Sequence, residues 1–146
     1  MTPSQRGQRR FVLDANALIS LLENRGVAAG RVRRIIEDAS RNGLPILLSA
    51  VNWGEVFYIA WRLHGEELAR ETEAKLRRLP IAIIAADMER ATRAAAIKQR
   101  HNLGYADAFA AELALEGRAW LVTADPEFSK LGKILSVYPL PQHGKN

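Results

Sequence analysis

The chain has 146 residues, of which 48% are hydrophobic and 25% charged, and its formal net charge is +5 at pH 7. This length fits one compact domain, 1–146, that can bury a sizeable core without disulfides or a structural metal. The absence of cysteine excludes a disulfide framework and a thiolate zinc site. No apolar stretch is long enough to span a bilayer. We therefore expect a cytoplasmic protein, with residues 1–8 as a flexible tail.

Short apolar runs alternate with longer segments of helical periodicity, a pattern typical of parallel strands joined by helices. In chain order, the expected elements are the strand Arg10–Leu13, the helices Ala17–Glu23 and Val32–Arg41, the strand Pro45–Ser49, the helices Val51–His64 and Glu66–Arg78, the strand Ile81–Ala85, the helices Met88–Arg100 and Tyr105–Glu116, and the strands Ala119–Thr123 and Ile134–Tyr138. The last strand could equally pair as an edge. The sequence thus predicts an α/β fold with a mostly parallel sheet of about five strands.

Four acidic residues follow expected strands or lie near the start of the helices behind them. They are Asp14, Glu55, Asp107 and Asp125. Each has a simple local explanation. An acid at these places can cap a helix, start a turn, be stabilised by the dipole of a helix near its N-terminus, or lie on the solvent-exposed face of a helix. In an open parallel sheet, however, such positions meet at the carboxyl edge of the strands. Their joint placement therefore favours a common site.

Four carboxylates in one place repel one another and raise their own pKa values unless cations lie among them. Hard divalent ions such as Mg²⁺ and Mn²⁺ prefer oxygen ligands, so a site without His or Cys points to them rather than to zinc. Two such ions about 4 Å apart can activate a water and stabilise the leaving oxygen of a phosphodiester. We expect Asp14 and Asp107 to hold the principal metal, with Glu55 and Asp125 completing the ligation or orienting the water.

Positive charge gathers ahead of the last two acids. The segment from Lys75 to His101 contains seven basic and two acidic residues, whereas acids dominate from Leu103 to Phe128. A basic surface beside an acidic focus suits a phosphate backbone near a metal. The candidate residues for binding such a backbone are Arg90, Arg93, Lys98 and Arg100. A solvated helix face explains the same charges equally well.

Four segments resemble, in order, the acidic motifs of PIN-domain ribonucleases: RFVLDANALISLL, SAVNWGEVFYIA, GYADAFAAELAL and LVTADPEF. The resemblance covers nearly the whole chain and is closest to the small VapC toxins of bacterial and archaeal toxin–antitoxin pairs. By this resemblance, the family's metal-binding acids match Asp14, Glu55, Asp107 and Asp125. Its supporting polar positions match Asn16 and Thr123, although an ordinary capping or turn contact explains each of these equally well.

The resemblance implies an α/β/α sandwich and cleavage of RNA that depends on Mg²⁺ or Mn²⁺ and leaves a 3′-hydroxyl and a 5′-phosphate. It also implies a homodimer silenced by a VapB-like antitoxin, for which a basic toxin makes an acidic tail reasonable. Two positions depart from the pattern: Ala15 stands where many relatives carry Ser or Thr, and Glu112 adds an acid. Glu112 lies five residues after Asp107, which advances a helix by about 500°, so we expect it on another face and at the surface.

Other functions fit less well. A haloacid-dehalogenase phosphatase needs a second Asp two residues after Asp14, where this chain has Asn16. A phospho-receiver would want paired acids before its phospho-acceptor, and a dinucleotide enzyme would want a glycine-rich turn. Trp53, Phe57 and Trp61 are expected to form core or dimer contacts rather than base stacks. One alternative stays open, a non-catalytic nucleic-acid or protein-binding module that keeps the acids as structure, and metal binding discriminates between the two.

Overall fold

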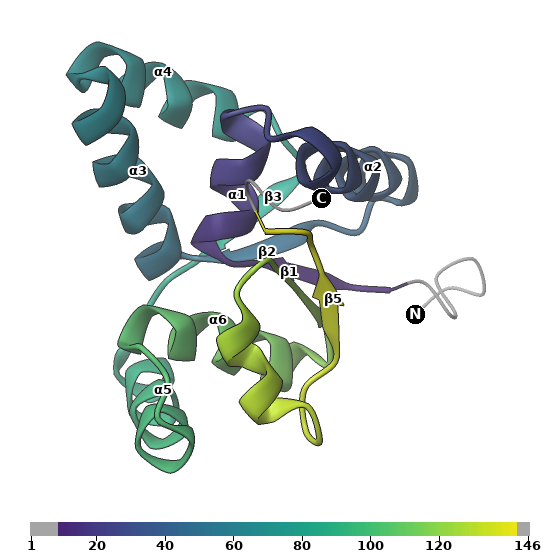
Figure 1. Cartoon of the computed structure of the whole chain (residues 1–146), viewed down its shortest axis with the longest axis vertical. Helices are drawn as coiled ribbons and strands as arrows, with labels where there is room; N and C mark the ends of the chain where they lie inside the picture. Colours follow the sequence, from purple (N-terminus) through teal and green to yellow (C-terminus); the bar gives the residue numbers. More distant parts are fainter. Residues whose placement is uncertain (1–8, 143–146) are drawn as a thin grey trace.

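The computed structural model describes residues 9–142, in which five parallel strands form one sheet with helices on both faces (Figure 1). The strands are β1 (Phe11–Leu13), β2 (Ile46–Ser49), β3 (Ile81–Ile84), β4 (Trp120–Thr123) and β5 (Val137–Pro139). Their order is β3-β2-β1-β4-β5, so that the first strand of the chain lies in the middle. The expected α/β/α sandwich is confirmed. The tail expected at residues 1–8 lies outside the described part of the chain.

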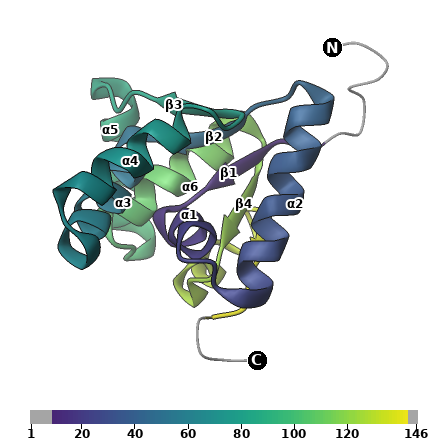
Figure 2. The ribbon, with the colours of Figure 1, turned by 90° about the horizontal axis from the view of Figure 1, so that it is seen from above.

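Two helical layers enclose the sheet (Figures 1 and 2). One layer contains α1 (Ala15–Leu22), α2 (Gly26–Asn42), α3 (Ala50–His64) and α4 (Glu66–Leu76). The other contains α5 (Met88–His101), α6 (Tyr105–Gly117) and the 3₁₀ helix η2 (Pro126–Leu131). The six expected helices are therefore present, whereas η2 was not predicted.

Alternation along the strands divides the core between the two layers. Successive side chains of a strand point to opposite faces, and on β1 Leu13 packs in the cluster of α1 and α2 while Val12 packs in that of α6. On β4, Val122 and Leu121 divide in the same way. Because these strands are covered on both faces, their sequences read as continuous apolar runs rather than alternating ones.

The starts of α2 and β5 differ from the expected ones. Helix α2 begins at Gly26 (φ 49°), six residues before Val32, because this left-handed glycine turns the chain directly from α1 into α2. Strand β5 begins at Val137 and pairs in parallel with β4 as an edge strand. The expected start at Ile134 is wrong, since that side chain is 55% exposed and lies in the turn after η2.

The parallel arrangement places the carboxyl ends of β1, β2 and β4 at one rim of the sheet. Leu13, Ser49 and Thr123 are the last residues of these strands, and α1 and α3 begin directly beyond the first two. Whatever follows each strand is therefore brought to the same edge. Within residues 9–142, none of the helices combines the length and the apolarity that crossing a membrane requires.

Candidate active site

Asp14 is the buried acid of this rim, with 3% of its surface exposed. Its Oδ1 accepts a hydrogen bond from the backbone N–H of Ala17 (2.8 Å), which caps α1, and its Oδ2 accepts one from the hydroxyl of Thr123. The pKa of Asp14 is raised to about 7 when all effects are combined. Burial is the largest cause, the charges of Asp107 and Asp125 act in the same direction, and the hydrogen bonds from Thr123 and Ala17 lower the pKa. The residue thus caps a helix and also lies among other acids.

Thr123 connects two of the acidic motifs. Its side chain is 2% exposed at the end of β4, where Oγ1 donates to Asp14 and accepts the backbone N–H of Asp125 (2.9 Å). Asp125 in turn accepts the N–H of Glu127 (2.9 Å) and caps η2. The expected contact between Thr123 and the acids is therefore present, and it fixes the Asp14 carboxylate against the loop that carries Asp125.

Asp107 lies half-buried in the first turn of α6. Its pKa is raised to about 6, mostly by burial and in addition by the charges of Asp125, Glu55 and Glu127. Charge interactions weaken with distance, so these three acids lie near enough to Asp107 to disfavour its ionised form. The structure thus brings together Asp14, Glu55, Asp107 and Asp125. It adds Glu127, a fifth acid that the sequence analysis left out. Its position two residues after Asp125, in Asp-Pro-Glu, could have indicated that it lies near the other acids.

Glu55 reaches the rim from the second turn of α3, where it is half-buried. Asn52, one turn earlier, donates from Nδ2 to Glu55 Oε1 (3.3 Å) and to the carbonyl oxygen of Ala106 (3.0 Å), the residue before Asp107. Asn52 is 1% exposed. The sequence analysis assigned no role to this residue, although an asparagine three positions before an acid on a helix was the available signal.

Asn16 is placed differently from the expectation. Its side chain is exposed, and its backbone oxygen accepts a hydrogen bond from Ser20 Oγ (2.9 Å). In the part of the chain that the structure describes, no hydrogen bond joins the Asn16 side chain to an acid. The structure therefore brings Thr123 to the acids and leaves Asn16 at the surface beside them.

The expected RNA-binding residues on α5 are mostly engaged within the chain. Arg90 Nη1 and Arg93 Nε each donate to Glu112 (3.1 Å), and both also contact Glu116. Glu112 is only 2% exposed. Its expected surface position is wrong because the α6 face that carries it packs against α5 rather than facing water.

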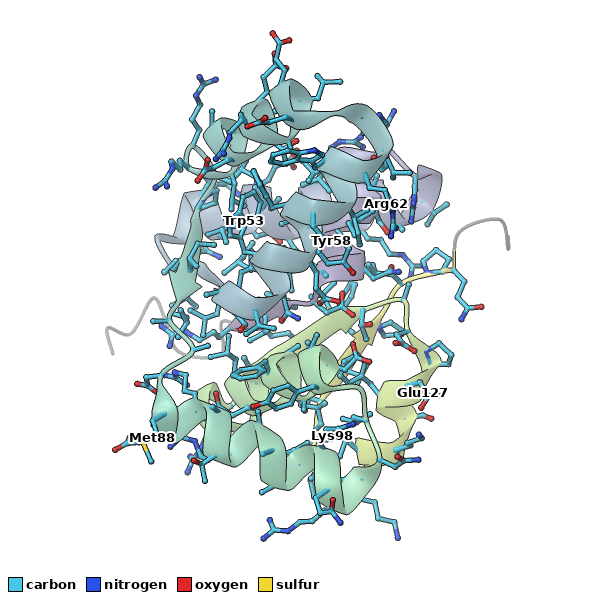
Figure 3. All side chains as sticks on the ribbon, turned by 90° about the vertical axis from the view of Figure 1, so that its left-hand side faces the viewer. Trp53, Tyr58, Arg62, Met88, Lys98 and Glu127 are labelled. Atoms are coloured by element: carbon cyan, nitrogen blue, oxygen red, sulfur yellow. The ribbon has the colours of Figure 1, made fainter. Side chains whose placement is uncertain are left out.

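The other two candidate cations lie further along α5. Lys98 donates from Nζ to the carbonyl oxygen of Leu103 (3.0 Å), so one of its hydrogen bonds is already satisfied within the chain. Arg100 is exposed near the end of the helix. Figure 3 looks onto the rim and shows Tyr58 and Arg62 of α3 on one side, with Lys98 and Glu127 on the other.

The donor set of the rim fits a hard divalent cation. The clustered side chains are carboxylates, and burial and mutual repulsion make the ionised forms of Asp14 and Asp107 costly without a neighbouring cation. In the present rotamers, no three acidic or histidine side chains of residues 9–142 lie close enough together to hold one ion. Binding would therefore require the half-buried carboxylates to turn toward Asp14.

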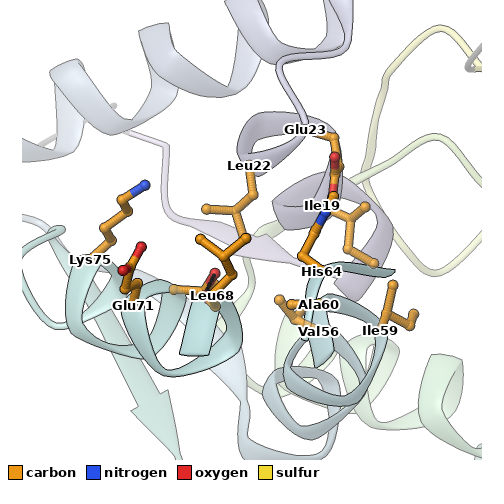
Figure 4. Close-up of a pocket in the computed structure, with 11 residues that line it drawn as sticks. Ile19, Leu22, Glu23, Val56, Ile59, Ala60, His64, Leu68, Glu71 and Lys75 are labelled. Carbon is orange, nitrogen blue, oxygen red and sulfur yellow. Dashed lines mark hydrogen bonds and ion pairs between the residues drawn. The ribbon is translucent and has the colours of Figure 1, made fainter. Parts of the chain in front are cut away.

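A separate cavity of about 270 Å³ lies between α1, α3 and α4 (Figure 4). The apolar part of its lining consists of Ile19, Leu22, Val56, Ile59, Ala60 and Leu68. At its edge, His64 Nε2 and Glu23 Oε1 lie 2.8 Å apart. The four rim acids do not line this cavity, so it is separate from the acidic rim.

Five parallel strands between two helical layers, with acids gathered at their carboxyl edge, define an α/β/α sandwich with an acidic site. The sequence profile described as "PIN domain" matches residues 11–134. The chain therefore belongs to the PIN domain family, which confirms the expected relationship. No match is found among curated protein sequences.

Solved structures share this fold over most of the chain. A toxin–antitoxin complex from Klebsiella pneumoniae has a TM-score of 0.63 at 23% identity, covering 88% of this chain and 98% of the other. VapBC2 from Rickettsia felis, bound to a DNA fragment from its promoter, has a TM-score of 0.66 at 14% identity, with coverages of 88% and 97%. VapC20 from Mycobacterium tuberculosis, a toxin described as cleaving the sarcin-ricin loop, has a TM-score of 0.68 at 15% identity, with coverages of 84% and 95%.

Proposed function

We propose that this protein is an endoribonuclease that depends on Mg²⁺ or Mn²⁺ and hydrolyses RNA phosphodiester bonds at the acidic rim. The observation that carries the proposal is the convergence of Asp14, Glu55, Asp107 and Asp125 from four separate parts of the chain. One of them, Asp14, is buried with a pKa raised to about 7, a costly arrangement that a bound cation would relieve.

The residues of the rim would have different roles in binding the metal and orienting the water. Asp14 and Asp107 would hold the principal cation, and Thr123 keeps the Asp14 carboxylate in one orientation. Glu55 and Asp125 would complete the ligation or orient the attacking water. When bound, the divalent ion supplies charge stabilisation to the phosphate and lowers the pKa of water. The reaction requires no side-chain nucleophile, since water attacks the phosphorus and the 3′-oxygen leaves.

The same proposal extends to a toxin–antitoxin pair. Its support is the shared fold with the toxin–antitoxin complexes from Klebsiella pneumoniae and Rickettsia felis. The cavity between α1, α3 and α4 combines apolar lining residues with a polar pair, Glu23 and His64. An amphipathic helix of an antitoxin would match these two features, since such helices place apolar side chains in a groove.

A second candidate is a non-catalytic binding module on the same fold. It is favoured by the capping contacts, since Asp14 caps α1 and Asp125 caps η2, so both acids have a structural role without any metal. A module of this kind would show no stabilisation by divalent ions, whereas a metal-binding nuclease would be stabilised by them.

The deciding experiment is cleavage of a mixture of structured RNAs by the purified protein with Mg²⁺, Mn²⁺ or EDTA. Asp14→Asn and Asp107→Asn are purified in the same way, and Asp38→Asn on α2 is the control because it removes an acid that pairs with Arg41 away from the rim. We expect metal-dependent cleavage that both rim variants lose and the control retains. Equal cleavage by all preparations would assign the activity to a contaminant, and no cleavage together with no metal-induced thermal shift would favour the binding module.

A further inference from the structure

Asn52 is an amide side chain buried between two helices of opposite layers. It is 1% exposed on α3, and Nδ2 donates both of its hydrogens, to Glu55 Oε1 (3.3 Å) on its own helix and to the carbonyl oxygen of Ala106 (3.0 Å) on α6. Both partners are acceptors, so the amide has only one workable orientation, because a flipped amide would point its oxygen at two oxygens.

This orientation leaves the amide oxygen of Asn52 without a partner. Oδ1 is buried and accepts no hydrogen bond. An unsatisfied buried polar atom is unfavourable, and native proteins contain few of them. An apolar side chain would avoid that cost, as Val56 does one turn later on the same helix. Packing alone therefore does not explain an asparagine at this position.

The contact between α3 and α6 has other residues to maintain it. Val51 packs against Ala108 and Phe109 in a small apolar cluster between α3, α5 and α6. By contrast, the bond from Asn52 is the only hydrogen bond to the Glu55 side chain within residues 9–142. What depends on Asn52 is thus the direction of one carboxylate rather than the packing of two helices.

We infer that Asn52 is a positioning residue, which holds the Glu55 carboxylate and ties it to the helix that carries Asp107. Ala106 directly precedes Asp107, so a single amide fixes the relative position of two acids from different motifs. This inference rests on the proposed metal site. Partners that orient metal ligands typically change metal affinity by about 10- to 100-fold when removed.

The test compares Asn52→Val with Asn52→Thr, two β-branched side chains of nearly equal shape, of which only threonine can donate a hydrogen bond. Mn²⁺ affinity is measured by titration calorimetry on protein without RNA, and thermal midpoints are measured in EDTA. Val56→Ala is the control, because it weakens packing on the same helix without touching the amide.

We expect Asn52→Val to bind Mn²⁺ about tenfold more weakly than the wild type, with Asn52→Thr in between. The metal-free thermal midpoint should fall less in Asn52→Val than in Val56→Ala, while Val56→Ala keeps the wild-type affinity. An Asn52→Val affinity within about twofold of wild type, or equal losses in the valine and threonine variants, would overturn the inference.

The same titration separates this inference from the proposed function. If the wild type binds Mn²⁺, Asp14→Asn does not, and Asn52→Val binds normally, the metal site stands and the role of Asn52 falls. If the wild type binds no Mn²⁺, both fall.

Discussion

At the scale of single residues, Asp14 links ionisation to folding. Its pKa is about 7 in the folded chain against an ordinary value of 3.8, and the pKa of Asp107 is about 6. Both values are raised, so the folded state binds these protons more tightly than the unfolded state. Their contribution to stability is complete below pH 3.8 and is lost as the pH rises through about 6 for Asp107 and about 7 for Asp14.

We therefore predict that the metal-free protein loses stability between pH 5 and pH 8, and that Asp14→Asn loses less, because the amide does not ionise. Urea unfolding in EDTA at both pH values measures this difference, with Asp38→Asn as the control. Mn²⁺ should restore stability at pH 8 more than at pH 5, since it binds the deprotonated carboxylates. An Asp14→Asn variant with the same pH dependence as the wild type would contradict the prediction.

Thr123 is the second residue whose removal has a defined consequence. Thr123→Val keeps the shape but removes the donor to Asp14 and the acceptor for the N–H of Asp125. We predict a loss of about 1–3 kcal/mol in the free energy of unfolding, because buried polar groups lose their partner. The control is Thr72→Val on α4, an exposed hydroxyl that bonds only its own helix and should change stability by less than about 0.5 kcal/mol. Equal effects on urea unfolding would show that the Thr123 contact is unimportant.

At the scale of elements, α5 and α6 are joined by charges. Glu112 is buried on α6 and accepts hydrogen bonds from Arg90 and Arg93 on α5, with Glu116 one turn further. The buried carboxylate of Glu112 is compensated by two charged donors, and removing either partner would leave a charge without its counterion. These contacts hold the helix that carries Asp107 against its neighbour.

We predict that Glu112→Gln lowers the free energy of unfolding by about 2 kcal/mol, since it weakens two charge-assisted hydrogen bonds. Glu116→Gln serves as the control and should cost less than about 1 kcal/mol, because the Glu116 side chain is 48% exposed. Urea denaturation at neutral pH measures both variants. A cost for Glu116→Gln as large as that for Glu112→Gln would contradict the ranking.

The strands, the helices and the edge of the sheet beside which the acids lie could be predicted, because they depend on local periodicity and on the rule that parallel strands share a carboxyl edge. The partners of Glu112 and Asn52 could not. Arg90 lies 22 positions before Glu112, and Ala106 lies 54 positions after Asn52, so these contacts depend on how helices pack against one another. For the same reason a run of positive charge on α5 did not reveal which arginines are already paired.

At the scale of the whole molecule, the sheet ends in the edge strand β3, which carries apolar side chains at the surface. Ile83 is 42% exposed, and Met88, just beyond the strand, is 85% exposed. Exposed apolar side chains beside the open edge of a sheet mark a surface that proteins usually cover. We therefore predict that the protein forms a homodimer and that this surface contributes to its contact.

The corresponding prediction is that Ile83→Lys, alone or with Met88→Lys, converts a dimer into a monomer, because a charge at such an interface would be left unpaired. Ile134→Lys is the control, since it introduces the same charge at a 55% exposed isoleucine near the opposite edge of the sheet. Sedimentation velocity measures the mass. A monomeric wild type, or dissociation caused only by Ile134→Lys, would contradict the prediction.

The central place of β1 has a consequence during synthesis. Strand β1 pairs on one side with β2, which is made early, but on the other side Phe11 pairs with Trp120 of β4. The hydroxyl that holds Asp14 also belongs to β4, at Thr123, so this side of the strand is completed only near the end of translation. Distant pairing of this kind delays folding until most of the chain is available. A ribosome making this protein would therefore carry an incompletely folded nascent chain until the segment beyond residue 120 has emerged from the exit tunnel.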